Sequence, residues 1–261
     1  MSDPRGLNAE IEGYLLDLTH VAHRHLGDDL LGLYLHGSAV QVDLWPQTSD
    51  LDVLGVIVHP LSDERRAGLA ADLAHQTRPI PAIGLELILC LADQARAPSY
   101  DFHFEFALST GATWPTEIEP PGVASDVLIN VALCRQMGRA LSGPPADTLF
   151  GPVPRAALTR AVADELRWHQ QNLDDPLSAS SAANAVLNAA RAVFAAETGR
   201  IISKTEGGLW WLAERPQDYL VRKAVAIRQG DPSVFLSHQA VRAFLVHALG
   251  EIERDLISPG D

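Results

Sequence analysis

The sequence predicts an α+β fold in which a domain of mixed strands and helices is followed by an all-helical domain. The first 150 residues contain three apolar runs of strand length, Leu30–Leu35, Val53–Val58 and Ile83–Leu91. After a stretch dense in Pro and Gly, apolar residues recur at a spacing near 3.6 up to the end of the chain. We therefore place one domain in residues 1–150 and a second, a bundle of four or five helices, in residues 151–261.

Local patterns predict the remaining elements. In the first domain helical spacing or a capping residue indicates helices at 8–25, at 62–76 with Ser62 as the N-cap, and at 125–141. The helices expected in the second domain are 156–171, 178–197, 205–213, 216–229 and 232–257. Residues 101–106 alternate between apolar and polar side chains, as a half-buried strand does. The polar face of that strand, His103 and Glu105, either lines a binding cleft or is ordinary solvated surface.

The feature that points to chemistry is Gly37-Ser38, followed after a polar connection by Asp50-Leu51-Asp52. Residues two apart in a strand project to the same face, so Asp50 and Asp52 present two carboxylates side by side. At about 4 Å and an effective dielectric constant near 20, two carboxylates repel by about 4 kcal/mol, and a bound cation removes that cost. Mg²⁺ prefers such oxygen ligands and completes its shell with phosphates and water. The Gly37-Ser38 backbone and hydroxyl suit phosphate oxygens.

Glu86 is the third candidate acid. It is the one charge in the apolar run Ile83–Leu91, and Glu is almost never fully buried without a partner. The alternatives to a site are a glutamate on the solvent face of an edge strand and, for Asp50 and Asp52, a solvated loop.

The pattern of Gly-Ser followed by Asp-x-Asp resembles the signature of the DNA polymerase β-like nucleotidyltransferase superfamily. The stretches 35–52, 141–154 and 198–204 resemble one family within it, the streptomycin/spectinomycin adenylyltransferases, which are aminoglycoside O-nucleotidyltransferases. The resemblance runs through nearly the whole chain in order. It implies that residues 1–150 form a mixed-sheet nucleotidyltransferase domain and that the helical domain, 151–261, closes the nucleotide and acceptor cleft.

The resemblance also implies roles for individual residues. Asp50, Asp52 and Glu86 are expected to bind Mg²⁺, with Glu86 also serving as the general base that accepts the hydroxyl proton. Gly37 and Ser38 are expected to hold the phosphates of ATP, the co-substrate.

Two cations of the helical domain match positions that the family uses to bind the nucleotide. They are Arg191, on an otherwise apolar helix, and Lys204, which precedes a helix. A charge on an apolar helix needs an anionic partner, so Arg191 is either paired with an anion or a surface arginine whose charged end reaches water. Without the resemblance, Lys204 is an ordinary surface lysine.

The acceptor positions of the family are not retained. Where the family has tryptophans and aspartates, this chain has Ala107, Asn172, Leu177 and Ser181. Trp168, Asp174 and Asp175 lie near enough in the sequence to take over with a shift of register.

Composition limits the partners. With 33 acidic and 20 basic residues the formal net charge is −13, which disfavours nucleic acid and anionic membrane surfaces and favours a cationic acceptor. The two cysteines, Cys90 and Cys134, lie in apolar segments and predict buried thiols. No apolar run is long enough to span a membrane and no apolar signal core opens the chain, so we expect a cytoplasmic monomer.

The sequence thus predicts an enzyme that transfers AMP from ATP to a hydroxyl of an aminoglycoside or aminocyclitol antibiotic, with Mg²⁺, and releases pyrophosphate. Two alternatives stay open. One is a nucleotidyltransferase with a different acceptor, such as a protein side chain or a metabolite, and the other is a nucleotide-binding homologue without catalysis.

Overall fold

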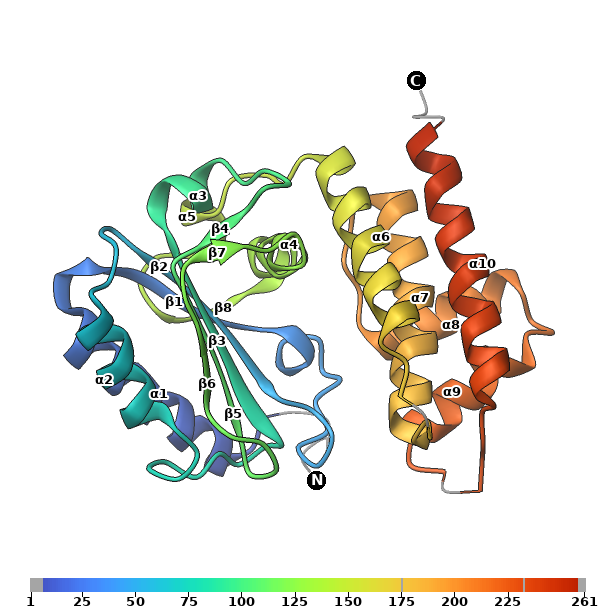
Figure 1. Cartoon of the computed structure of the whole chain (residues 1–261), viewed down its shortest axis with the longest axis horizontal. Coiled ribbons are helices and arrows are strands. Elements are labelled where there is room, and N and C mark those ends of the chain that lie inside the picture. The colour runs from blue at the N-terminus through green and yellow to red at the C-terminus, as the bar shows by residue number, and fades with distance from the viewer. Residues whose placement is uncertain (1–6, 175, 232, 258–261) are drawn as a thin grey trace. The chain divides into compact units, whose positions relative to one another are not determined.

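The computed structural model of the protein describes residues 7–174, 176–231 and 233–257. The chain divides into two compact units, Met1–Val153 and Pro154–Asp261. The first unit contains a mixed sheet with helices and the second is helical (Figure 1). The α+β fold predicted from the sequence is therefore confirmed.

A six-stranded sheet forms the centre of the first unit. Its strands are β1 (Leu30–His36), β2 (Leu51–Ile57), β3 (Gly84–Leu91), β5 (Phe106–Gly111), β6 (Glu117–Glu119) and β8 (Arg139–Ser142), in the spatial order β6-β5-β3-β2-β1-β8. Strands β2 and β3 run parallel, while all other neighbours pair antiparallel. A separate two-stranded sheet pairs β4 (His103–Phe104) with β7 (Gly122–Val123).

Helices cover both faces of the main sheet. They are α1 (Ala9–Leu26), α2 (Asp63–Leu73), α3 (Ala92–Arg96), α4 (Val127–Met137) and α5 (Ala146–Leu149). Figure 1 shows α1 and α2 on one face of the sheet and α4 on the other. The apolar stripe of α1, with Ile11, Leu15 and Leu18 fully buried, packs with the inner face of β1, β2 and β3 in one core. The burial of each of these side chains stabilises the folded state by about 1.5–3 kcal/mol.

Five helices make up the described part of the second unit. They are α6 (Arg155–Gln171), α7 (Ala179–Thr198), α8 (Lys204–Glu214), α9 (Tyr219–Arg228) and α10 (His238–Ile257). Helix α7 begins at the N-cap Ser178 and ends at Gly199, whose φ of 70° suits glycine. Ser203 and Glu206 form a capping box at the start of α8. Within the described ranges, no helix has the length and apolar character needed to cross a membrane.

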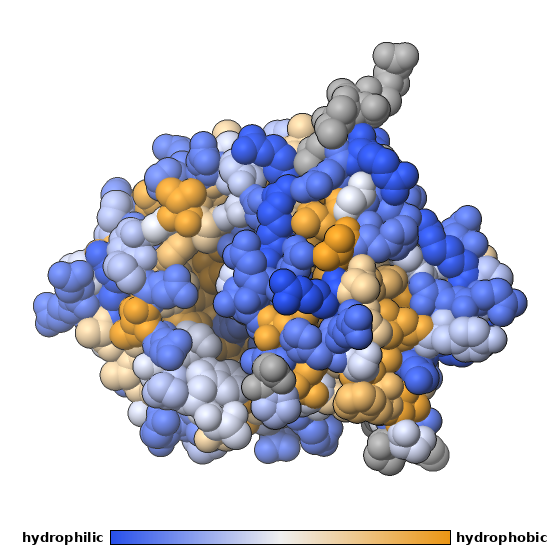
Figure 2. Space-filling model, turned by 45° about the vertical axis from the view of Figure 1, so that its right-hand side comes forward, coloured by the Kyte–Doolittle hydropathy of each residue, from blue (hydrophilic) through white to orange (hydrophobic). Residues whose placement is uncertain are grey.

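The face drawn in Figure 2 is largely hydrophilic and carries several apolar patches. The large apolar side chains that remain exposed in the helical unit are Trp168, Leu209, Tyr219, Phe235 and Val246. Single exposed apolar residues of this kind are normal on a soluble domain and define no site by themselves.

Two predicted elements of the first unit differ from the structure. The helix expected to reach Leu141 stops at Met137, because glycine is a poor helix former and the Gly138 backbone leaves the helical conformation with a ψ of 132°. The following residues instead form β8, which pairs with β1 and becomes the edge strand of the sheet. The single strand expected over 101–106 is divided at Glu105 between two sheets.

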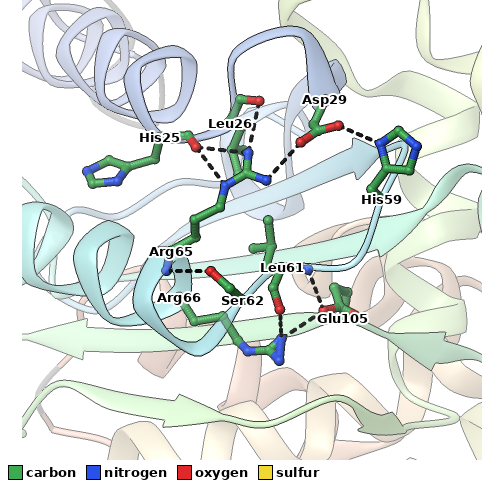
Figure 3. Close-up of polar contacts among 9 residues, drawn as sticks. All are labelled: His25, Leu26, Asp29, His59, Leu61, Ser62, Arg65, Arg66 and Glu105. Atoms are coloured by element: carbon green, nitrogen blue, oxygen red, sulfur yellow. Dashed lines mark hydrogen bonds and ion pairs between the residues drawn. The ribbon is translucent and has the colours of Figure 1, made fainter.

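Glu105 interrupts the strand because its carboxylate turns into the protein. Its Oε1 accepts hydrogen bonds from the Leu61 backbone N–H at 2.9 Å and from Arg66 Nη1 at 2.8 Å (Figure 3). The Arg66 guanidinium also donates to the Leu61 carbonyl at 2.6 Å. His103 is exposed but Glu105 is buried, so for Glu105 neither a solvated surface nor the lining of an open cleft is correct. The ion pair of Glu105 with Arg66 fixes the segment that leads from β2 into α2.

Arg65, the residue before Arg66 in α2, joins that helix to the end of α1. It donates to the backbone carbonyls of His25 and Leu26 and forms an ion pair of 2.8 Å with Asp29, which also contacts His59 (Figure 3). The last carbonyls of a helix have no partner within it, and Arg65 supplies one. The sequence prediction that Ser62 caps α2 is confirmed, since its hydroxyl accepts from the Arg65 N–H.

The connection from β1 to β2 opens with a tight turn that places a valine in a glycine position. After the 3₁₀ turn Gly37–Ala39, the Asp43 N–H bonds to the Ser38 carbonyl at 3.0 Å. A bond from the sixth residue of a turn to the first is the Schellman closure, whose left-handed position falls on Val42. Val42 has a φ of 52°, in the region that a β-branched residue adopts only at a cost.

We predict that Glu105→Ala lowers the free energy of unfolding by about 3 kcal/mol, because Arg66 and the Leu61 N–H lose a buried partner. Urea unfolding measures the change. As the matched control, Glu64→Ala on the exposed face of α2 should change stability by less than about 0.5 kcal/mol. Equal effects of the two substitutions would remove the structural role assigned to Glu105.

We predict that Val42→Gly raises the free energy of unfolding by about 1 kcal/mol. Glycine removes the free-energy cost of the left-handed backbone in the folded protein. This gain is larger than the stabilisation that glycine's greater conformational entropy gives the unfolded chain. The control is Val58→Gly, at another exposed valine, whose φ is not positive. There glycine relieves no strain and only increases the conformational entropy of the unfolded chain, so the free energy of unfolding should fall. A destabilised Val42→Gly protein in the same urea titration would contradict the strain assignment.

Candidate active site

Three carboxylates converge at the amino ends of β2 and β3. In the parallel register of these strands Asp52 lies directly opposite Glu86, and Asp50 comes just before β2 begins. One oxygen from each of the three residues lies within 4.8 Å of the other two. Asp50 and Asp52 are half-buried and Glu86 is exposed, so the cluster faces solvent. Because β3 is an interior strand of the sheet, the alternative of Glu86 on an edge strand is wrong.

Gly37 allows the backbone to approach this cluster. It follows β1 with a φ of 65°, and a Cβ atom at this position would overlap the carboxylate of Asp52. Any other residue would therefore have to displace Asp52 as well as adopt a strained backbone. The glycine identified in the sequence is required by the position of the acid.

His36, the last residue of β1, lies beside the same acid. It pairs with Asp52 in the antiparallel register of β1 and β2. The side chain is 2% exposed, and burial lowers the pKa of His36 to about 3. The imidazole is consequently neutral at physiological pH and adds no positive charge beside Asp52.

Hydrogen-bond donors without partners gather in the residues that join the turn to the acids. Seven buried side-chain polar atoms have no hydrogen-bond partner within the described ranges, and four of them belong to residues 36–45. These four are His36 Nδ1, Ser38 Oγ, Gln41 Nε2 and Trp45 Nε1. The sequence singled out Ser38 but missed Gln41 and Trp45, because their residue types carry no sign of a missing partner. These atoms would suit a ligand that is rich in acceptor oxygens.

The two cations predicted from the helical domain belong to one polar cluster inside the second unit. Glu165 on α6 pairs with His169 at 3.1 Å. Burial acts to raise the pKa of Glu165, but the His169 contact and the charges of Arg191 and Lys204 together lower it. Lys204 Nζ also approaches Asn184 Oδ1 at 3.4 Å. Arg191 and Lys204 are both half-buried, so each residue keeps part of its surface in solvent.

The residues at the family's acceptor positions make mostly local contacts. Asn172 donates to the Trp168 carbonyl at 2.9 Å at the end of α6, and the Ser181 hydroxyl accepts from Ser178 at 2.8 Å at the start of α7. Ala107 lies on β5 opposite Ile88. Of the nearby residues that could substitute, Trp168 is exposed, Asp174 is exposed, and Asp175 lies outside the described residues.

The amino-acid sequence is similar to known proteins over most of its length. Residues 148–251 match the family described as "Aminoglycoside adenylyltransferase, C-terminal domain". An aminoglycoside (3'') (9) adenylyltransferase of Escherichia coli is 28% identical over 94% of this chain and 96% of its own length. The enzyme of the same name from Shigella flexneri is 30% identical over 81% of this chain and 82% of its own length.

The fold is shared with a solved structure. The crystal structure of a spectinomycin adenyltransferase from Enterococcus faecalis with ATP and spectinomycin superposes with a TM-score of 0.74 at 19% identity, covering 93% of this chain and 99% of that one. At this identity the likeness establishes the architecture, and the sequence relatives establish kinship. The protein therefore belongs to the aminoglycoside (3'') (9) adenylyltransferase family.

Proposed function

We propose that the protein transfers AMP from ATP to a hydroxyl of an aminoglycoside or aminocyclitol antibiotic, in a reaction that depends on Mg²⁺ and releases pyrophosphate. The observation that carries this proposal is the convergence of Asp50, Asp52 and Glu86 beside the Gly37-Ser38 turn, in a chain of this family. The relatives are named for adenylyl transfer to such antibiotics, and their solved neighbour was crystallised with ATP and spectinomycin.

The residues present fit a divalent cation. All donors are carboxylate oxygens, the Gly37 backbone leaves the Asp52 carboxylate its space, and the unpaired Ser38 hydroxyl offers a place for an oxygen ligand next to it. Asp50, Asp52 and Glu86 would hold Mg²⁺. When bound, the ion supplies charge neutralisation for the carboxylates and for the nucleotide phosphates.

The remaining chemistry belongs to this chain's own groups. Ser38 and the Gly37 backbone would orient the phosphates by hydrogen bonds, which places the reacting phosphorus for attack. Glu86 is the most exposed of the three acids and the one that an acceptor hydroxyl can approach from solvent, so we assign it as the general base. The proton of that hydroxyl passes to the Glu86 carboxylate while pyrophosphate leaves.

We also assign nucleotide binding in the helical unit to Arg191 and Lys204. Their charges act together on Glu165, which supports a common position in that unit. Both are cations that retain solvent contact, as binding to an anion requires. The predicted closure of the helical domain over the nucleotide, the monomeric state, the exclusion of nucleic acid and the cytoplasmic location remain predictions of the sequence.

One observation favours a different acceptor as the second candidate. Asn172 and Ser181, at positions where the resemblance places acceptor-binding residues, are engaged in local helix-end contacts and carry no charge. Streptomycin and spectinomycin would then have to be bound by other residues, or the acceptor is a different hydroxyl compound.

We predict that Asp50→Asn lowers the rate of Mg²⁺-dependent AMP transfer at least about a hundredfold. The metal clamp contributes several kcal/mol, and each 1.4 kcal/mol is a factor of ten in rate. Pyrophosphate release measures the rate. Asp93→Asn, which alters an exposed aspartate of α3, is the control and should retain full activity. A variant at residue 50 that keeps the wild-type rate and Mg²⁺ dependence would remove the metal assignment.

We predict that Glu86→Gln keeps ATP binding but slows transfer by about 10²- to 10⁴-fold, which is the usual contribution of a general base. Calorimetry measures binding, and pyrophosphate release across a panel of aminoglycosides and aminocyclitols measures transfer, with the variant as the blank. Release by the wild-type protein with one compound names the acceptor. If a folded variant loses ATP binding, Glu86 is required to hold the metal ion and its nucleotide, and the assignment as the base loses its support.

A panel without any release, from a wild-type protein that binds ATP, would move the assignment to the second candidate. Loss of ATP binding by the wild-type protein itself would overturn both candidates.

A further inference from the structure

The loop between β1 and β2 carries two side-chain hydrogen-bond donors to which the proposed function assigns no role. Gln41 Nε2 and Trp45 Nε1 are enclosed in the protein and have no hydrogen-bond partner among the described residues. An indole N–H is a donor only, so no rotation or reassignment of atoms can satisfy it without an acceptor. Leaving such a donor buried and unpaired costs about 1–3 kcal/mol.

The backbone of this loop is tied to the candidate active site at both ends. At one end the Asp43 N–H bonds to the Ser38 carbonyl, which closes the turn that contains Gln41. At the other end the Trp45 N–H donates to Ser49 Oγ at 3.1 Å, and the Trp45 carbonyl accepts from the N–H of Ser49 at 2.7 Å. Ser49 directly precedes Asp50. The loop is therefore tied to the Gly-Ser turn at its start and to the first acid at its end.

Chemistry indicates what the donors would bind. Donors suit acceptor oxygens and not a metal ion, and the loop residues Ser38, Gln41 and Trp45 together offer a hydroxyl, an amide and an indole N–H. Hydrogen bonds from neutral N–H groups to a charged oxygen are worth more than those to a neutral one. The anion expected at this site is the polyphosphate of the nucleotide.

The loop also has a means of changing conformation. The donors are enclosed, so a phosphate oxygen reaches them only when the loop shifts. Val42, which lies between Gln41 and Asp43, is held in the left-handed region at a cost, and such strain favours departure from this conformation.

We propose that Gln41 and Trp45 are positioning residues for the nucleotide, and that they donate hydrogen bonds to the β- and γ-phosphate oxygens of ATP when the loop shifts onto it. This inference rests on the proposed function, because it assumes that ATP binds at the Gly-Ser turn. It assigns to this chain a phosphate contact beyond Gly37 and Ser38.

The test is the substitution Trp45→Phe, which removes the N–H and keeps an aromatic ring. We expect the dissociation constant of Mg-ATP, measured by calorimetry on the full chain without acceptor, to rise about tenfold, and that of pyrophosphate with Mg²⁺ to rise similarly. The affinity for adenosine should not change. Because the variant also removes an unpaired buried donor, the ligand-free protein should keep or exceed the wild-type melting temperature, a result that a purely structural tryptophan would not give.

Two further variants make the outcome decisive. Gln41→Met, which removes the second donor at nearly constant volume, should weaken Mg-ATP and pyrophosphate binding in the same way. Trp211→Phe is the matched control, because its indole N–H already donates to Asp218 at 2.8 Å; it should lower the melting temperature and leave Mg-ATP affinity unchanged.

The proposal is overturned if Trp45→Phe and Gln41→Met both bind Mg-ATP as the wild-type protein does, or if adenosine affinity falls as much as that of ATP. A wild-type protein that binds no Mg-ATP would instead overturn the proposed function, so the two failures are distinguishable.

Discussion

Mutual repulsion of three carboxylates, with oxygens within 4.8 Å of one another, is the constraint around which the first unit is organised. At such distances a pair of carboxylates repels by about 4 kcal/mol at an effective dielectric constant near 20. The sheet holds them there because the parallel register of β2 and β3 fixes Asp52 opposite Glu86. The residues that alternate with these acids, such as Leu51 and Leu85, are fully buried, so a slip of register would expose the core.

One end of the parallel strands β2 and β3 carries the candidate site, and the opposite end carries structural contacts. The acids occupy the amino ends of β2 and β3, beside the Gly37 turn, where the carboxylates stay in contact with solvent. At the opposite ends, the Arg66–Glu105 pair and the contacts of Arg65 hold the chain rigidly as it leaves β2 for α2 (Figure 3). Stability is thus concentrated away from the site, and the unpaired and strained groups are concentrated at it, in residues 36–45.

Charge follows a similar division between the units. The first unit presents acids and neutral donors around the turn, and burial keeps His36 beside Asp52 uncharged. The second unit gathers Arg191 and Lys204 around the carboxylate of Glu165. A cation cluster that is balanced by a half-buried glutamate can remain in place in a chain whose formal net charge is −13.

The sequence by itself determined the α+β class, the kinship and the acids, because each is written in local patterns: apolar periodicity, a glycine before a serine, and one charge in an apolar strand. Only the tertiary structure decided the roles of Glu105, which an alternating pattern assigned to the polar face of a strand, and of residues 139–142, which join the sheet as β8. It also revealed Gln41 and Trp45. Whether a donor has a partner, or a strand a neighbour, depends on residues distant in the chain, and local patterns carry no record of those contacts.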